Sequence, residues 1–208
     1  MIVTIEGLIG AGKTTLSDCL HQELKRRDIK AHLIAEPTPS DNVWLDKYYS
    51  DQKRYAFQTQ LSMFLHRLRS HTMASSLDDT VVLMDRSLIG DASFAYAQFA
   101  SGYMEKAELD LYDEICRAMA RDLKVDLCVV VQCDIETALD AVKERATSTS
   151  EVQGVTSEYQ SHLQHGLELS LKSLDCPVWR VPRLPFGDAY SDQIERIAQV
   201  LQEKLSQA

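Results

Sequence analysis

A phosphate-binding pattern stands near the start of the chain, where residues 7–14 read GLIGAGKT and fit GxxxxGK[ST] without a gap. It follows an apolar run and opens a helical one, so backbone N–H groups at a helix N-terminus can surround a phosphate. The lysine is expected to reach the β- and γ-phosphates, and the threonine hydroxyl to ligate Mg²⁺. The pattern therefore predicts a site for Mg·ATP. Its candidate residues are Gly7, Gly10, Ala11, Gly12, Lys13, Thr14 and Thr15.

Three charged residues at the ends of two other apolar runs could act on a phosphoryl group. Asp85 ends the run VVLMD and resembles a Walker B acid, whose carboxylate holds Mg²⁺ or its waters. Glu36 ends the run AHLIAE, where a carboxylate could accept a hydroxyl proton or orient the attacking oxygen. Arg86 follows, and its guanidinium could stabilise charge developing on the phosphate. Each alone could be an ordinary strand-end ion pair, but together beside a phosphate loop they indicate phosphoryl transfer.

The elements that must position these residues alternate along the chain. Strands are predicted at 2–5, 31–36, 81–85, 126–132 and 178–181. Helices are predicted at 15–27, 52–77, 88–101, 105–122, 135–146, 156–174 and 189–205, and a polar loop at 147–154. The alternation predicts an α/β fold with a five-stranded parallel sheet and helices on both faces, as a single P-loop domain over 1–208. Ligands bind at the carboxyl edge of such sheets, where all the candidate groups would meet.

Composition narrows the function classes. The 208 residues are 45% hydrophobic and 25% charged, with a formal net charge of −9, so a protein that coats nucleic acid is not expected. The sequence contains no run of about 18 apolar residues, so no membrane span is predicted. Because strand-like sequence starts at residue 2, a signal peptide is not expected. Five cysteines without CxxC spacing favour reduced thiols and a cytoplasmic location.

Among proteins with a phosphate loop, the sequence favours a small-molecule kinase. It contains no NKxD element, through which GTPases usually read guanine, and it is short for a motor ATPase. A long helical stretch between the second and third predicted strands offers a place for an acceptor pocket instead.

These motifs together resemble the deoxynucleoside kinase family, and most closely its bacterial deoxyadenosine/deoxyguanosine kinases. The segments that carry the resemblance are EGLIGAGKTT, the EP-containing stretch from residue 35 to 69, MDRSLIGDA, and KERATSTSEVQG. The resemblance covers residues 1 to about 165 and implies ATP as donor, Mg²⁺ as cofactor and a homodimer. It also implies that Glu36 activates the 5′-hydroxyl, that Arg86 lies beside the 5′-oxygen and the phosphoryl group, and that Tyr49 meets the ribose 3′-hydroxyl. Tyr48 is an alternative to Tyr49.

The resemblance also places residues around the nucleobase. Gln60 falls at the base-binding glutamine, with Gln58 as a rival two residues away. Gln60 is preferred because the same alignment puts Arg67 at the base-side arginine, which pairs with Asp91. In the family that pair accompanies deoxyadenosine, deoxyguanosine or deoxycytidine rather than thymidine. The candidate walls for the flat base, which could equally be plain core aromatics, are Trp44 and Phe57.

The predicted lid, near residues 143–155, departs from the family pattern. The family usually carries two arginines there in an RxR-like arrangement. Counting forward from the preceding helix puts Arg145 at the first position and Thr147 at the second, whereas counting back from the following helix gives Thr147 and Thr149. By either count a full pair is absent, so cation cover over the phosphates is expected to be thin. Glu151 is a candidate for the lid acid that meets the sugar.

Two rival readings remain. Thymidylate kinases share a similar loop and a segment like DRSLIGDASFAY, but they usually read EPGGT where this chain reads EPTPSDNVW. The missing glycine pair favours a nucleoside acceptor over a nucleotide. The other rival, a non-catalytic nucleotide-binding module, is supported only by the depleted lid.

Overall fold

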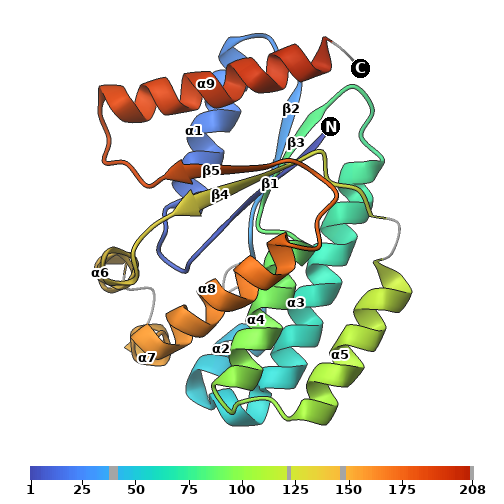
Figure 1. Cartoon of the computed structure of the whole chain (residues 1–208), viewed down its shortest axis with the longest axis vertical. Helices are drawn as coiled ribbons and strands as arrows, with labels where there is room; N and C mark the ends of the chain where they lie inside the picture. The colour runs from blue at the N-terminus through green and yellow to red at the C-terminus, as the bar shows by residue number, and fades with distance from the viewer. Residues whose placement is uncertain (38–41, 121–122, 146–148, 207–208) are drawn as a thin grey trace.

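A computed structural model describes residues 1–37, 42–120, 123–145 and 149–206 of the chain. Five strands form one parallel sheet in the order β2-β3-β1-β4-β5, which confirms the predicted α/β fold (Figure 1). The strands are β1 (Ile2–Gly7), β2 (Ala31–Ile34), β3 (Val81–Asp85), β4 (Leu127–Gln132) and β5 (Val178–Pro182). The central strands β1, β3 and β4 are almost wholly buried, in keeping with their predominantly apolar sequences.

Helices cover both faces of the sheet, with α1 and α9 on one side and α3, α4, α5 and α8 on the other (Figure 1). Leu16, Leu20 and Leu24, spaced four apart, are the buried stripe of α1 against the sheet. The helix bounds are α1 (Lys13–Arg26), α2 (Val43–Ser50), α3 (Gln52–Ser75), α4 (Leu88–Ala100), α5 (Lys106–Met119), α6 (Ile135–Arg145), α7 (Thr149–Gly154), α8 (Ser157–Leu171) and α9 (Asp188–Leu205).

Two segments differ from the sequence prediction. The short helix α2 was not predicted. Its N-cap is Asn42, whose side chain accepts a hydrogen bond from the Trp44 N–H at 3.0 Å. Asp51 then ends α2 and caps α3 by accepting from the Arg54 N–H at 3.2 Å. The segment predicted as a polar loop, 147–154, contains the helix α7. In the part of the chain that is described, no helix has the length and apolarity needed to cross a membrane.

Strand register brings the chemically active residues to one edge of the sheet. Asp85 at the end of β3 lies opposite Ile5 of β1, and Gly7 at the end of β1 lies opposite Val131 of β4. Strand β2 ends at Ile34, two residues earlier than predicted, so Glu36 stands just beyond the strand end. The phosphate loop, Glu36 and Asp85 therefore meet where the strands give way to loops and helices.

Candidate active site

The phosphate loop has the backbone that its sequence predicts. Gly10 and Gly12 have φ values of 86° and 90°, in the left-handed region that glycine adopts without strain. Lys13 begins α1 directly after them, is almost fully buried, and donates from Nζ to the Leu8 carbonyl at 2.8 Å. Burial and the nearby Arg86 charge lower the pKa of Lys13 to about 7.

Thr14 and Asp85 form the contact expected of a Mg²⁺ site. The Thr14 hydroxyl donates to Asp85 Oδ2 at 2.5 Å. The other oxygen, Oδ1, is buried without a hydrogen-bond partner among the described residues, and burial raises the pKa of Asp85. An orphaned carboxylate oxygen beside a threonine hydroxyl suits a hard cation that takes its other ligands from phosphates and water. The described residues contain no group of three His, Cys, Asp or Glu that could hold a metal without such ligands.

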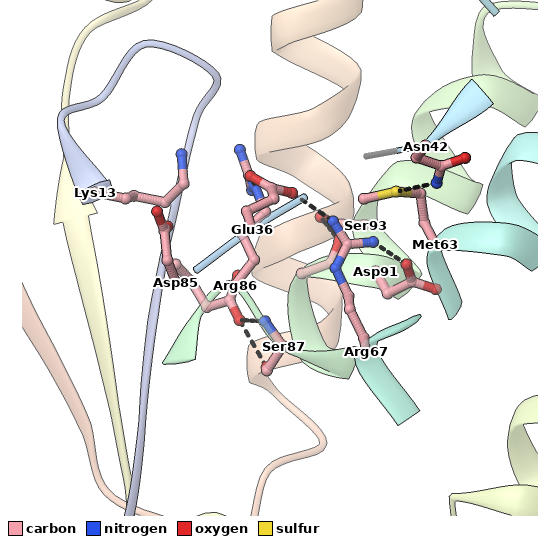
Figure 2. A network of polar contacts seen from close by, with 12 residues as sticks. Lys13, Glu36, Asn42, Met63, Arg67, Asp85, Arg86, Ser87, Asp91 and Ser93 are labelled. Carbon is pink, nitrogen blue, oxygen red and sulfur yellow. Dashed lines mark hydrogen bonds and ion pairs between the residues drawn. The ribbon is translucent and has the colours of Figure 1, made fainter. Parts of the chain in front are cut away.

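Glu36 lies between two arginines, in the middle of the polar network (Figure 2). Arg67 Nη2 donates to Glu36 Oε1 at 2.6 Å, and Arg86 Nε donates to Oε2 at 3.0 Å. Burial would raise the pKa of Glu36, but the charges of Arg86, Arg67 and Lys13 outweigh it and the pKa is lowered. Glu36 keeps 27% of its side chain exposed, so an ionised carboxylate remains reachable from the cavity.

The backbone at Arg86 is held in an unusual conformation by Glu6, a residue that sequence reasoning missed. Arg86 has a φ of 67°, which costs energy for a side chain with a Cβ. Directly after it, the Ser87 N–H and hydroxyl both donate to Glu6 Oε1, at 2.8 and 2.7 Å. Glu6 is fully buried in β1, and burial raises its pKa. A carboxylate inside the apolar run IVTIEG was the sequence signal that could have identified it.

From this turn Arg86 reaches back to the phosphate loop. Its Nη1 donates to the Gly7 carbonyl at 2.9 Å, while its Nε holds Glu36. The guanidinium of Arg86 thus links the phosphate loop to Glu36, the predicted general base. The ring of Phe94 lies 4.6 Å from the Arg86 guanidinium, which favours this position by a cation–π contact.

Asp91 is the centre of a buried polar cluster, in the part of the site that is predicted to face the acceptor. It is fully buried, pairs with Arg67 Nη1, and accepts from Gln60 at 2.9 Å and from the Tyr112 hydroxyl at 2.6 Å. Burial raises the pKa of Asp91, against the opposing Arg67 charge and these hydrogen bonds. Gln60 also receives a hydrogen bond on Oε1 from Gln98 at 2.9 Å, so both ends of its amide contact protein groups. The rival Gln58 is exposed on α3.

A cavity of about 570 Å³ joins the two halves of the site. This volume lies in the range of pockets that bury small ligands. Most of the predicted residues line it, namely Gly10, Gly12, Lys13, Thr14, Thr15, Glu36, Tyr49, Gln60, Arg67, Asp85, Arg86 and Arg145. Tyr48 lines it as well, beside Tyr49. The lining residues that sequence reasoning missed include Met63, Phe94, Gln98, Tyr159 and Arg183, and nothing in their local sequence marks them.

The predicted aromatic walls, Trp44 and Phe57, lie outside the cavity. Trp44 packs on Tyr55 with ring centroids 6.4 Å apart. Phe57 joins the separate apolar cluster around Phe64 and Tyr112. Both therefore make packing contacts in this structure, and a stacking role against the base stays a prediction for each. The apolar surface of the cavity comes from other side chains, among them Phe94 and Met63.

The lid is described only in part. Arg145 ends α6 and lines the cavity. Thr147 lies outside the described residues, and α7 includes Glu151 and Thr149, of whose side chains nothing is described. At the far end of α7, the Gly154 carbonyl accepts from Gln52 Nε2 at 3.2 Å, which ties the lid helix to the start of α3.

The chain is similar in sequence and in fold to known proteins. The sequence profile of the family described as "Deoxynucleoside kinase" matches residues 3–201. Deoxyadenosine kinase of Lactobacillus acidophilus is 27% identical over 157 residues, covering 73% of this chain and 69% of that protein. Deoxyadenosine/deoxycytidine kinase of Bacillus subtilis is 25% identical over 213 residues, covering 97% and 94%. The solved structure of deoxyadenosine kinase from M. mycoides with bound dATP has a TM-score of 0.80 at 24% identity, over 97% of this chain and all of that one.

Proposed function

Because this chain belongs to the deoxynucleoside kinase family, we propose that it transfers the γ-phosphoryl group of ATP to the 5′-hydroxyl of a 2′-deoxyribonucleoside. The observation that carries the proposal is a single cavity with Lys13 and Thr14 at one end and Glu36 facing its middle. A donor phosphate at the first and an acceptor hydroxyl at the second would lie in one enclosed space, as in-line transfer requires.

Glu36 is the proposed general base. Its lowered pKa keeps it ionised at neutral pH, so it can orient the 5′-hydroxyl and accept its proton. Arg86 contacts both Glu36 and the phosphate loop, from where its charge can stabilise the transferred phosphoryl group. Mg²⁺, held by Thr14 and Asp85 when bound, would neutralise charge on the phosphates. Closure of the lid, which includes Arg145, would exclude water from the transfer.

For the acceptor, we propose deoxyadenosine, deoxyguanosine or deoxycytidine in preference to thymidine. Arg67 and Asp91 form the buried polar pair that favours this choice in the family. Tyr49 is proposed to contact the sugar, and Gln60 the base. Gln60 Nε2 already donates to Asp91, so donating to a base would require it to exchange that hydrogen bond. Its Oε1 accepts from Gln98 and has a second lone pair that can accept from a base. Glu151 keeps its proposed role as the lid acid.

The decisive experiment is a coupled ATP assay over the four deoxynucleosides and thymidylate. We expect turnover of deoxynucleosides, lowest for thymidine, and none of thymidylate. Glu36→Gln should keep nucleoside binding and lose kcat by about 10²-fold or more, while Glu158→Gln, an exposed glutamate on α8, should match the parent protein. Turnover of thymidylate alone would favour a nucleotide kinase. ATP binding without any turnover would favour a non-catalytic module.

Three finer features belong to the same proposal: Mg²⁺ as the metal, a homodimer, and a role in nucleotide salvage in the cytoplasm. Omitting Mg²⁺ should abolish turnover. Light scattering should give twice the monomer mass of 23.5 kDa, and a mass equal to the monomer would contradict the dimer.

A further inference from the structure

We infer that Arg183, which follows β5, binds the phosphate chain of the donor nucleotide and supplies a cation that the lid lacks. The inference rests on the proposed function. Arg183 lines the same cavity as Gly12, Lys13 and Arg145, although it lies outside both the phosphate loop and the lid segment. Its Nε lies 3.9 Å from the position that a Cβ on Gly12 would occupy, so the guanidinium stands directly beside the loop.

The position of Arg183 is fixed by the scaffold. Its backbone N–H donates to the Gln132 carbonyl at 2.8 Å and so extends the pairing of β5 with β4. Its Nη1 donates to the Thr137 carbonyl in the first turn of α6 at 3.1 Å, and also lies 3.9 Å from Cys133 Sγ. Nη1 is thus anchored, while Nε and Nη2 have no hydrogen-bond partner among the described residues. Those N–H groups remain for an anion.

The charge of Arg183 is also less compensated by carboxylates than the charges of Arg67 and Arg86, which line the same cavity. Arg67 and Arg86 both pair with Glu36, whereas no carboxylate within the described ranges lies within ion-pair distance of Arg183. The Thr137 hydrogen bonds lower the pKa of Asp134, and the charge of Arg183 has a smaller effect in the same direction. The Asp134 carboxylate accepts those bonds from the Thr137 N–H and hydroxyl at 2.8 and 2.7 Å. A guanidinium without a full partner, beside a phosphate loop, suits bidentate binding of phosphate oxygens.

In this arrangement Arg183 would supply the positive charge that the missing lid arginine would otherwise bring to the phosphates. A lid arginine reaches the phosphates only when the lid closes, but a residue at a strand end is in place beforehand. Arg183 should therefore act mainly on the affinity for the donor. Its contact with the donor should require neither bound acceptor nor a closed lid. The contact should not depend on the donor's base, because all nucleoside triphosphates share the phosphate chain.

The test compares Arg183→Ala and Arg183→Lys with Arg180→Ala. Arg180 is a matched control because it lies on β5, three residues before Arg183, is exposed, and pairs with Glu168 at 2.7 Å outside the cavity. Dissociation constants for ATP and GTP are measured by calorimetry, and KM values for donor and nucleoside by the coupled assay. We expect Arg183→Ala to raise both donor constants at least tenfold, with nucleoside KM within about threefold, and Arg183→Lys to restore part of the loss.

Three results would overturn the inference: donor constants unchanged in Arg183→Ala, an equal loss in Arg180→Ala, or a loss confined to one base, which would indicate contact with the base. A melting temperature matching that of Arg180→Ala excludes unfolding as the cause, and if Arg183→Ala does not fold, Arg183→Lys decides by the same constants. Failure of the proposed function is distinguishable. The parent protein would then bind ATP and phosphorylate no nucleoside, while the ATP dissociation constants would still decide the role of Arg183.

Discussion

Replacing Tyr112 by Phe should destabilise the protein without stopping catalysis. The Tyr112 hydroxyl is buried and donates to Asp91 Oδ2 at 2.6 Å, whereas its ring packs edge-on against Phe64 and would be unchanged. A hydrogen bond to a charged group contributes about 1.5–3 kcal/mol. In a chain of this size each kcal/mol shifts the melting temperature by about 2–4 °C, so a fall of roughly 3–12 °C is expected.

The assay is thermal and urea unfolding, with Tyr96→Phe as the control because no described residue partners the Tyr96 hydroxyl. The kcat of Tyr112→Phe should stay within about threefold of the parent value, since the contacts of Arg67 with Asp91 and Glu36 remain. The destabilisation should shrink at low pH. The Tyr112 hydrogen bond lowers the pKa of Asp91, so it stabilises the ionised form, and its contribution fades as Asp91 becomes protonated.

A loss below about 0.5 kcal/mol at neutral pH would refute this reasoning, because it would mean that Asp91 does not depend on its hydroxyl partner. An equal loss in Tyr96→Phe would refute it too, since that variant removes a hydroxyl with no recorded partner.

Three further predictions follow from the site. Gly90→Ala would place a Cβ against the Glu6 carboxylate, so we expect kcat to fall at least tenfold in the coupled assay as the turn after β3 shifts, and unchanged kcat would contradict this. The pKa of Lys13 is lowered to about 7, so binding of a Mg·ATP analogue at pH 8 should take up nearly one proton, measured by calorimetry in two buffers. By the same linkage the free protein should gain stability as the pH rises above 7, because the unfolded lysine stays protonated. Gln60→Leu should lower kcat/KM for deoxynucleosides at least tenfold, whereas Gln58→Leu, at an exposed position, should leave it unchanged.

The sheet and the phosphate loop could be predicted because their signals are local. Apolar runs report buried strands directly, and the loop pattern includes its own strand and helix context. Helix α3 shows where local signals end. Its sequence contains Phe57 and Gln60 three residues apart, but only the packed structure shows that Phe57 faces the cluster of Phe64 and Tyr112 rather than the cavity.

Contacts between distant segments account for the rest of what was missed. Gln98 meets Gln60 from 38 residues away, and no spacing in the chain indicates that this hydrogen bond occupies the predicted base-binding amide. Arg183 reaches the phosphate loop only because β5 lies beside β4 in the sheet. Glu6 is different, because an acid in a buried strand is visible in the sequence and implies a partner.

One chain of polar contacts links the proposed nucleobase pocket to the proposed general base and the phosphate loop. Asp91 pairs with Arg67, Arg67 with Glu36, Glu36 with Arg86, and Arg86 with the carbonyl of Gly7 in the phosphate loop. The sequence resemblance treats Arg67 as a residue of the base pocket, but in the structure it also holds the proposed general base. Truncating it would leave Asp91 as a buried charge without its arginine, and would free one oxygen of Glu36. We therefore expect a substitution of Arg67 to change both nucleobase preference and the environment of Glu36, the proposed general base. Gln98 and Met63 line the cavity without belonging to this chain of contacts, so we expect them to be better positions at which to alter specificity.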